Sequence, residues 1–106
     1  MVAELPVHFK HAFVTGATGI VGVPLCEKLT EIGVRVTAYS RTAGDFGLPS
    51  AANHARGDIL DPVELASAVA GADVIFHLAA AVHGSASTFA EFERMNVTGT
   101  EYVIRA

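Results

Sequence analysis

The sequence predicts an α/β fold, in which a parallel β-sheet of about four strands is flanked by helices. Segments rich in β-branched and aromatic residues alternate along the chain with segments whose apolar residues recur at helical spacing. This alternation favours parallel strands joined by right-handed crossovers. In addition, "DVIFHLAAA" at 73–81 is a continuous apolar run of the length expected for a strand buried on both faces.

The first strand and the first helix are expected at 10–15 and 19–32. "HAFVTG" is rich in β-branched and aromatic residues and ends in glycine. The segment that follows spaces its apolar residues as a helix does, and Gly33 stands where a helix C-cap belongs. Pro24 removes a backbone donor, which a helix tolerates because this proline falls within about the first turn and a half.

The middle of the chain predicts two shorter strands separated by a loop. "VRVTAYS" alternates apolar and polar residues and predicts a second strand at 34–40, and "ARGDI" can form a short third strand at 55–59. Between them, residues 41–54 contain three clusters of turn residues and little periodicity. We therefore expect a loop there, with at most a weak helix.

Two further helices are expected on either side of the apolar run. Asp61 as N-cap, Pro62 at the first helical position and Glu64 in the first turn form a strong helix start, and Gly71 is a plausible stop. The segment 87–106 places Phe89, Phe92, Asn96, Gly99 and Val103 on one helical face. A buried Asn96 amide must be hydrogen-bonded, so we expect it to tie this helix to neighbouring loops.

Composition limits the classes of protein and partner. At 106 residues the chain is a single domain, 1–106, and its net charge of −4 provides no basic stripe for nucleic acid. No apolar run reaches the roughly 18 residues that span a bilayer, so no membrane partner is expected. Cys26 is the single cysteine, which fits a cytoplasmic location. The apolar content is 51% and the mean hydropathy is +0.42, which indicates strands covered on both faces or a surface for a partner.

Three glycines at three-residue intervals, Gly16, Gly19 and Gly22, lie between the first strand and its helix. The first would allow the sharp turn, the second would let the backbone approach a pyrophosphate, and the third would let the helix pack tightly on the sheet. The helix N-terminus then offers N–H groups and the positive end of its dipole to phosphates. The alternative is a tight turn without a ligand. Within a βαβ unit that also carries Thr15 and Thr18, we favour dinucleotide binding.

Four motifs together resemble one family. "TGATGIVG" is similar to the TGxxGxxG of the short-chain dehydrogenase/reductase superfamily, and "GDILD", "HLAA" and "NVTGT" follow in the order seen in its extended branch, the NAD-dependent epimerase/dehydratase family. The resemblance implies a Rossmann-type sheet with strand order 3-2-1-4. It also implies that Asp58 faces the adenine amino group, that Ile59 covers the adenine ring, and that Leu78, Ala79 and Ala80 line the ribose and nicotinamide half. The remaining cofactor-binding residues implied are Gly16, Thr18, Gly19, Ile20, Val21, Gly22 and Asn96.

The end of the second strand departs from the pattern that binds an unphosphorylated ribose. An acidic residue belongs there for NAD, but the sequence has Ser40 followed by Arg41. A hydroxyl and a guanidinium accommodate a 2′-phosphate, which a carboxylate would repel. We therefore expect NADP(H), with NAD as the alternative cofactor. A solvated surface arginine is the alternative interpretation of Arg41.

The family's catalytic pair is missing from these residues. The resemblance implies a Tyr-x-x-x-Lys pair for proton transfer during hydride transfer, but Tyr39 and Tyr102 are each followed at the fourth position by alanine. We expect no catalytic residue here. The chain then corresponds to the N-terminal, cofactor-binding part of an epimerase, dehydratase or reductase acting on a nucleotide sugar or a similar alcohol or ketone, and is inactive alone. The alternatives are a non-catalytic module that senses NADP(H) and a folded remnant without a ligand.

The histidines and the apolar surface complete the predictions. No pair of the five histidines has a metal-ligand spacing, and we expect no metal site. His77 should be a satisfied core or cofactor-adjacent side chain, His54 a loop residue, and His83 a loop residue near the substrate. We expect a homo-oligomer that buries the helix 87–106, the edge of the fourth strand, or both. The apolar patch on that helix should comprise Phe89, Phe92, Met95 and Tyr102.

Overall fold

The computed structural model describes residues 8–41, 47–79 and 88–106 of the chain, except the side chain of Phe92. Its four strands are β1 (His11–Thr15), β2 (Arg35–Ser40), β3 (Asn53–Arg56) and β4 (Val74–His77). They form one parallel sheet in the order β3-β2-β1-β4. This confirms the α/β class and the predicted order 3-2-1-4.

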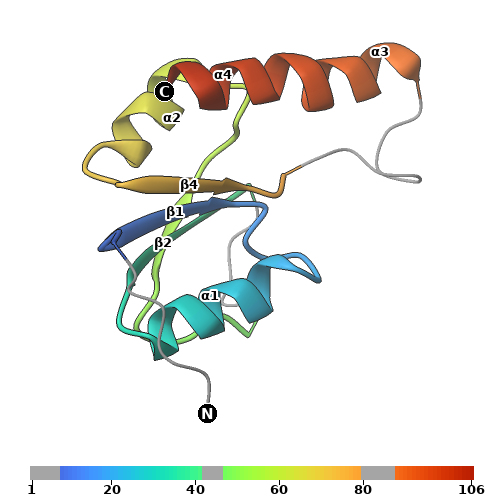
Figure 1. Cartoon of the computed structure of the whole chain (residues 1–106). Helices are drawn as coiled ribbons and strands as arrows, with labels where there is room; N and C mark the ends of the chain where they lie inside the picture. Colours follow the sequence, from blue (N-terminus) through green and yellow to red (C-terminus); the bar gives the residue numbers. More distant parts are fainter. Residues whose placement is uncertain (1–7, 42–46, 80–87) are drawn as a thin grey trace.

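The helices cover both faces of the sheet. They are α1 (Gly22–Glu31), α2 (Pro62–Val69), α3 (Phe89–Glu93) and α4 (Gly99–Arg105), with a π-helical segment η1 (Arg94–Thr98) joining α3 to α4. In Figure 1, α1 lies on one side of the sheet, and α2 and the C-terminal helix lie on the other. Because the strands are parallel, their carboxyl ends meet at one edge of the sheet.

Two separate apolar clusters fill the space between the sheet and these helices. Side chains alternate along β1, so Ala12 and Val14 pack with Cys26 of α1, whereas Phe13 packs on the opposite face with Tyr39. The rings of Phe13 and Tyr39 lie 5.1 Å apart, centroid to centroid. Most buried residues of the α1 cluster are alanine or valine, whereas the opposite cluster contains the two buried aromatic rings. The other buried members of the second cluster are Ile59, Leu65, Val69 and Val103.

Three predicted boundaries shift in the structure. The first helix begins at Gly22 rather than at residue 19, because residues 16–21 form a turn. The third strand is 53–56 rather than 55–59, since its pairing with β2 begins at Thr37 and Asn53 and the chain turns after Gly57. The second helix begins as predicted: Asp61 Oδ1 accepts from the Glu64 amide at 3.1 Å.

The prediction that the fourth strand is buried on both faces was wrong. All four residues of β4 are half-buried. Within the described residues, β4 pairs only with β1 and is an edge of the sheet. Among the described residues, β4 is thus paired on one side only and forms the fourth-strand edge that was expected.

The predicted buried face of the C-terminal helix was wrong in its first half. Gly99 and Val103 are buried as expected, but Phe89 is 80% exposed and Asn96 is also exposed. The wide turns of η1 insert extra chain between the two halves, so a single 3.6-residue period does not describe both. Asn96 is therefore not a buried amide on the apolar face. Phe92 also belonged to that predicted face, and its side chain lies outside the described residues.

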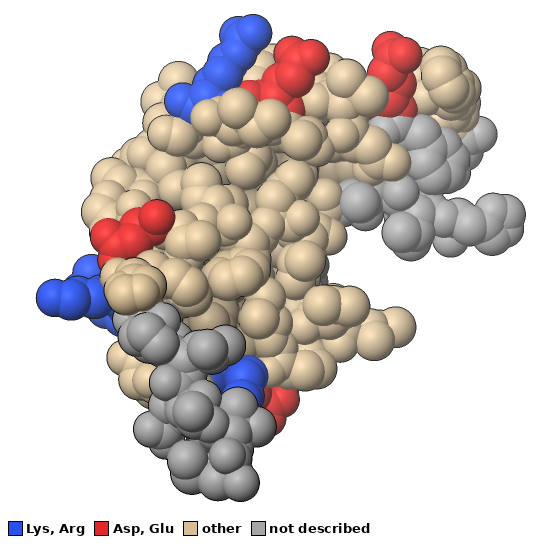
Figure 2. Space-filling model, in the orientation of Figure 1, with Lys and Arg blue, Asp and Glu red and all other residues tan. Residues whose placement is uncertain are grey.

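The surface carries few charged groups. On the face shown in Figure 2, Lys and Arg side chains stand apart from one another, with acidic side chains between them. No helix in the described ranges combines the length and the apolarity needed to cross a membrane.

Candidate functional site

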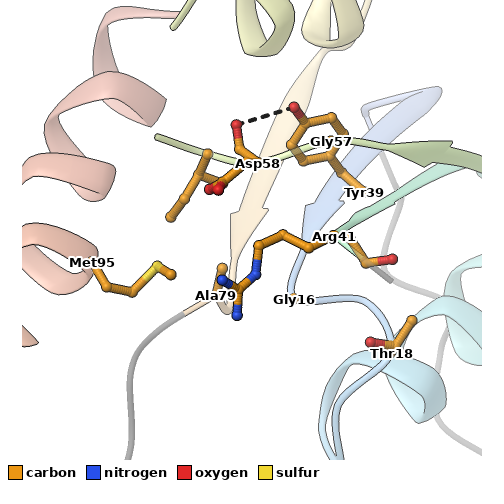
Figure 3. A pocket seen from close by; sticks show the side chains of 10 residues that line it. Gly16, Thr18, Tyr39, Arg41, Gly57, Asp58, Ala79 and Met95 are labelled. Carbon is orange, nitrogen blue, oxygen red and sulfur yellow. Dashed lines mark hydrogen bonds between the residues drawn. The ribbon is translucent and has the colours of Figure 1, made fainter. Parts of the chain in front are cut away.

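A pocket opens at the carboxyl ends of the strands, between the β1–α1 turn and the C-terminal helix (Figure 3). Its volume is about 170 Å³. Ten residues of the β1–α1 turn, the carboxyl ends of the strands and η1 line it: Gly16, Thr18, Tyr39, Ser40, Arg41, Gly57, Asp58, Ile59, Ala79 and Met95. In α/β proteins with open parallel sheets this edge is where ligands bind.

The β1–α1 turn is held in place by main-chain contacts. Gly16 has φ +65°, and a Cβ built on it would lie 2.7 Å from the backbone nitrogen of Ala79. A Cβ on Gly22 would overlap the carbonyl oxygen of Gly16. Gly16 thus permits the sharp turn, as predicted. Gly22 is the first residue of α1, and its lack of a side chain lets the helix start lie against the main chain of Gly16 and Ala17 just after β1.

The outer side of the same turn is open. Gly19 is exposed, and a Cβ there would meet only the Gly16 carbonyl oxygen, at 3.4 Å. Ile20 is 96% exposed and Val21 is 63% exposed. Helix α1 begins at this point without a side-chain cap and with no acidic residue in its first turn. A helix start of this kind leaves its N–H groups and positive dipole end available to an anion.

A directed chain of hydrogen bonds joins the ends of β1 and β4 to the C-terminal helix. Thr15 Oγ1 accepts from the amides of Leu78 at 3.0 Å and Ala79 at 3.2 Å. Its proton is then donated to His77 Nδ1, at 2.6 Å. His77 Nε2–H donates in turn to Thr100 Oγ1 at 3.0 Å. Thr100 Oγ1 donates its own proton to the Asn96 carbonyl oxygen at 2.6 Å and so accepts from His77, which corresponds to the neutral, Nε2-protonated ring.

The surroundings of His77 favour that neutral form. Burial lowers the pKa of the His77 imidazole below its ordinary value. The ring is half-buried and both nitrogens have partners, which confirms the prediction of a satisfied histidine. Among the described residues, no group of three or more His, Cys, Asp or Glu side chains could hold a metal ion. His83 lies outside the described residues.

Ser40 at the end of β2 and Arg41 after it form the other end of the pocket, beside β3. Ser40 is buried, and its hydroxyl oxygen lies 2.7 Å from His54 Nε2. His54 is therefore part of β3, and its prediction as a loop residue was wrong. The next residue, Arg41, is exposed and its guanidinium extends into the pocket in Figure 3. Arg56 Nε donates to the Arg41 carbonyl oxygen at 3.2 Å.

Tyr39 closes the floor of the pocket. Its hydroxyl donates to the Asp58 carbonyl oxygen at 3.3 Å (dashed line in Figure 3) and to Glu64 Oε1 at 3.4 Å. Burial, with a smaller contribution from the Glu64 charge, raises the pKa of Tyr39 to about 12. The phenol therefore stays protonated at neutral pH and cannot serve as an acid–base group there.

Asp58 and Ile59 follow β3 and face the pocket. Asp58 Oδ1 accepts from the Leu60 amide at 3.0 Å, which fixes the turn after β3. Ile59 is buried and packs against α4, where a Cβ on Gly99 would come within 2.6 Å of its Cδ1 atom. The Asp58 carboxylate is thus held by the Leu60 amide, and the Ile59 side chain by its packing against α4.

The pocket brings together half of the predicted cofactor-binding residues. Gly19, Ile20, Val21, Gly22, Leu78 and Asn96 lie outside its lining, and Ala80 lies outside the described residues. Sequence reasoning missed Tyr39, Gly57 and Met95. Tyr39 directly precedes Ser40, and Gly57 is the first residue of "GDILD", so both could have been predicted from their neighbours in the sequence. The predicted residues that line the pocket are Gly16, Thr18, Ser40, Arg41, Asp58, Ile59 and Ala79.

Comparison with known proteins assigns the family. Residues 12–106 match the model of the NAD dependent epimerase/dehydratase family. The chain belongs to this family. It is 37% identical over 93 residues to a 2-alkyl-3-oxoalkanoate reductase of Stenotrophomonas maltophilia, an alignment that covers 88% of the chain and 28% of that relative. It is 34% identical over 110 residues to a 3 beta-hydroxysteroid dehydrogenase/Delta 5-->4-isomerase of Mycobacterium tuberculosis, covering 98% of the chain and 30% of that protein.

Solved structures share the fold. An epimerase from Methanothermobacter thermautotrophicus superposes with a TM-score of 0.81 at 27% identity, covering 91% of the chain and 31% of the epimerase. UDP-glucose 4-epimerase from Brucella ovis, solved in complex with NAD, gives a TM-score of 0.78 at 23% identity, with 91% and 31% covered. The chain thus spans less than a third of the length of these relatives.

Proposed function

We propose that the chain binds NADP(H) along the carboxyl edge of its sheet and supplies the cofactor-binding part of an oxidoreductase of this family. The observation that carries the proposal is the pairing of two unlike ends in one pocket. One end is the open glycine turn at the start of α1, and the other is Ser40 with Arg41. The pyrophosphate would lie at the turn, the adenine against Asp58 and Ile59, and the nicotinamide half toward Ala79 and its neighbours.

The preference for NADP(H) rests on the residues after β2. Arg41 is exposed beside the buried Ser40 hydroxyl, and no carboxylate stands at these two positions. A carboxylate there would accept from the ribose hydroxyls of NAD, whereas a guanidinium pairs with a phosphate. Solved relatives include NAD complexes, and this is the feature by which the present chain would differ.

For the reaction, we favour hydride transfer between the cofactor and an alcohol or ketone. Relatives at 34–38% identity include proteins named as oxoalkanoate reductases, hydroxysteroid dehydrogenases and a ketoreductase. A nucleotide sugar is the second substrate class, since solved relatives include epimerases of UDP-glucose. These 106 residues contain no Tyr-x-x-x-Lys pair, so we expect them to bind cofactor without turnover. A non-catalytic NADP(H) sensor would lack that pair as well, and it is the second candidate function.

Calorimetric titration of the chain with NADPH and NADH tests the proposal. Charge-assisted hydrogen bonds are worth about 1.5–3 kcal/mol, so NADPH should bind roughly tenfold or more tightly than NADH. Equal or reversed affinities would refute the NADP preference. No binding of either at millimolar concentration would refute the cofactor role.

We also propose that the chain self-associates through the C-terminal helix or the β4 edge. The patch we expected there does not form as one surface, since Met95 and Tyr102 are half-buried against the second core cluster. The exposed large apolar side chains of this helix are Phe89, Val97 and Ile104, at 80%, 51% and 79% exposure. Sedimentation at micromolar concentration should give a mass above 11.0 kDa, which Ile104→Glu should reduce. A mass of 11.0 kDa for the unmodified chain would contradict the proposal.

A further inference from the structure

A second arginine stands beside the ribose end of the pocket. Arg56 ends β3, and the parallel register pairs it with Ser40. Paired residues of neighbouring strands project from the same face of a sheet, so Arg56 and Ser40 share a face. Arg56 Nε also donates to the Arg41 carbonyl oxygen at 3.2 Å, which holds the two arginines side by side.

The two guanidinium groups line a common depression that adjoins the cofactor pocket. This shallow site has a volume of about 330 Å³ and is lined by Arg41, Arg56, Gly57, Asp58 and Glu64. Arg41, Gly57 and Asp58 also line the cofactor pocket described above. A group attached to a ribose at Ser40 and Arg41 would therefore enter the depression.

The carboxylates of the depression are directed to the chain itself. Asp58 Oδ1 accepts from the Leu60 amide, and Glu64 Oε1 accepts from the Tyr39 hydroxyl. Neither Arg41 nor Arg56 forms an ion pair with a carboxylate of the described residues. The two acidic residues would moderate the positive potential of the two guanidinium groups in this depression.

We infer that Arg56 is a second cation for the 2′-phosphate of the cofactor and a determinant of cofactor choice. This inference rests on the proposed NADP(H) function. A phosphomonoester carries nearly two negative charges at neutral pH and presents three acceptor oxygens, which one exposed arginine does not satisfy. Arg41 and Arg56 would approach it from the ends of neighbouring strands, and Ser40 is next to Arg41 in the sequence and opposite Arg56 in the sheet register.

The test compares three single variants of the chain by calorimetric titration with NADP⁺ and NAD⁺. Arg56→Gln should weaken NADP⁺ binding about tenfold and leave NAD⁺ binding within about twofold. Glu64→Gln removes a negative charge from the same depression and should strengthen NADP⁺ binding about twofold to threefold. Arg105→Gln makes the same change of charge at a residue that lines neither site, and should change neither affinity.

The outcomes separate this inference from the proposed function. If the unmodified chain binds NADP⁺ more tightly than NAD⁺ but Arg56→Gln retains that ratio, Arg56 is not a phosphate-binding residue and the proposed function stands. If Arg56→Gln weakens both cofactors equally, its role is structural and the inference fails. If the unmodified chain shows no preference for NADP⁺, both the inference and the NADP preference fail.

Discussion

The two ends of the pocket are built in different ways. At the glycine turn, the close contacts are between main-chain atoms: Gly16 faces the Ala79 amide nitrogen, and Gly22 faces the Gly16 carbonyl. At the β2–β3 end, the exposed side chains of Arg41 and Arg56 line the depression where we propose that the 2′-phosphate binds. The first end should tolerate almost no substitution and should not distinguish NADP from NAD. The second should tolerate substitution and decide between them.

The largest effect is expected at the turn. Gly16→Ala forces a side chain into φ +65° and places its Cβ 2.7 Å from the Ala79 nitrogen. We expect a loss of about 3 kcal/mol in the free energy of unfolding, with both cofactors affected alike. The midpoint temperature of thermal unfolding should fall by more than about 10 °C.

Gly71→Ala is the matched control for the turn. Gly71 has φ +87°, but a Cβ there meets nothing within 4 Å. It should therefore lose only about 1 kcal/mol from backbone strain. Equal losses at the two positions would show that the contact with Ala79 contributes nothing.

The next effect concerns cofactor choice. Arg41→Asp replaces a cation with a carboxylate that can accept from the ribose hydroxyls, so the NADPH to NADH affinity ratio should fall at least tenfold. Fluorescence titration of the reduced cofactors measures both affinities. Unfolding stability should stay within about 0.5 kcal/mol, because Arg41 is an exposed side chain. A large loss of stability with an unchanged ratio would reverse the roles of the two ends.

The same contrast explains what could be predicted from the sequence. The β1–α1 turn was predictable because the spacing of its glycines reflects local backbone constraints. The start of α2 was predictable in the same way from Asp61 and Pro62. The strand order followed from the alternation of elements and the resemblance. Three features depended on tertiary pairing and were not predictable: the half-exposure of β4, the phase shift at η1 and the placement of His54 on β3.

The site followed the same division. Residues inside contiguous motifs, such as Asp58 and Ile59, line the pocket as expected. Arg56 was missed because its proximity to Arg41 arises from the β2–β3 register, 15 residues away along the chain. Met95 was assigned to an outer patch, whereas η1 turns it toward the pocket. Contiguous motifs predict local backbone geometry. Contacts between side chains of different strands can be predicted only when the strand register is known.

A smaller effect is expected for the pH dependence of stability, through His77, which is hydrogen-bonded to Thr15 at the end of β1. The pKa of His77 is lowered in the folded protein, so the unfolded chain binds its proton more readily, and stability should fall as pH drops below about 6.5. Protonation would also place an N–H against Thr15 Oγ1, which already accepts from two amides. His77→Gln should lose less stability between pH 7.5 and 5.5 than the unmodified chain does, as urea unfolding can measure. Equal losses in the two proteins would contradict the neutral, two-partner ring.

The smallest effect is expected at the floor of the pocket. Tyr39→Phe removes two long hydrogen bonds, of 3.3 Å and 3.4 Å, and keeps the buried ring. The free energy of unfolding should fall by less than about 1 kcal/mol, and the NADPH to NADH ratio should not change. A shift in the ratio would mean that the hydroxyl, through Glu64, takes part in cofactor choice.

The central claim is that the cofactor lies along the carboxyl edge of the sheet and joins the two ends of the pocket. Amide chemical shifts of the isotope-labelled chain, recorded during titration with NADP⁺, test it most directly. The largest changes should fall at 16–22, at Ser40 and Arg41, and at 57–59, while the turns at Gly33 and Gly71 on the opposite edge stay unchanged. Changes concentrated at that opposite edge, or none at saturating cofactor, would contradict the account.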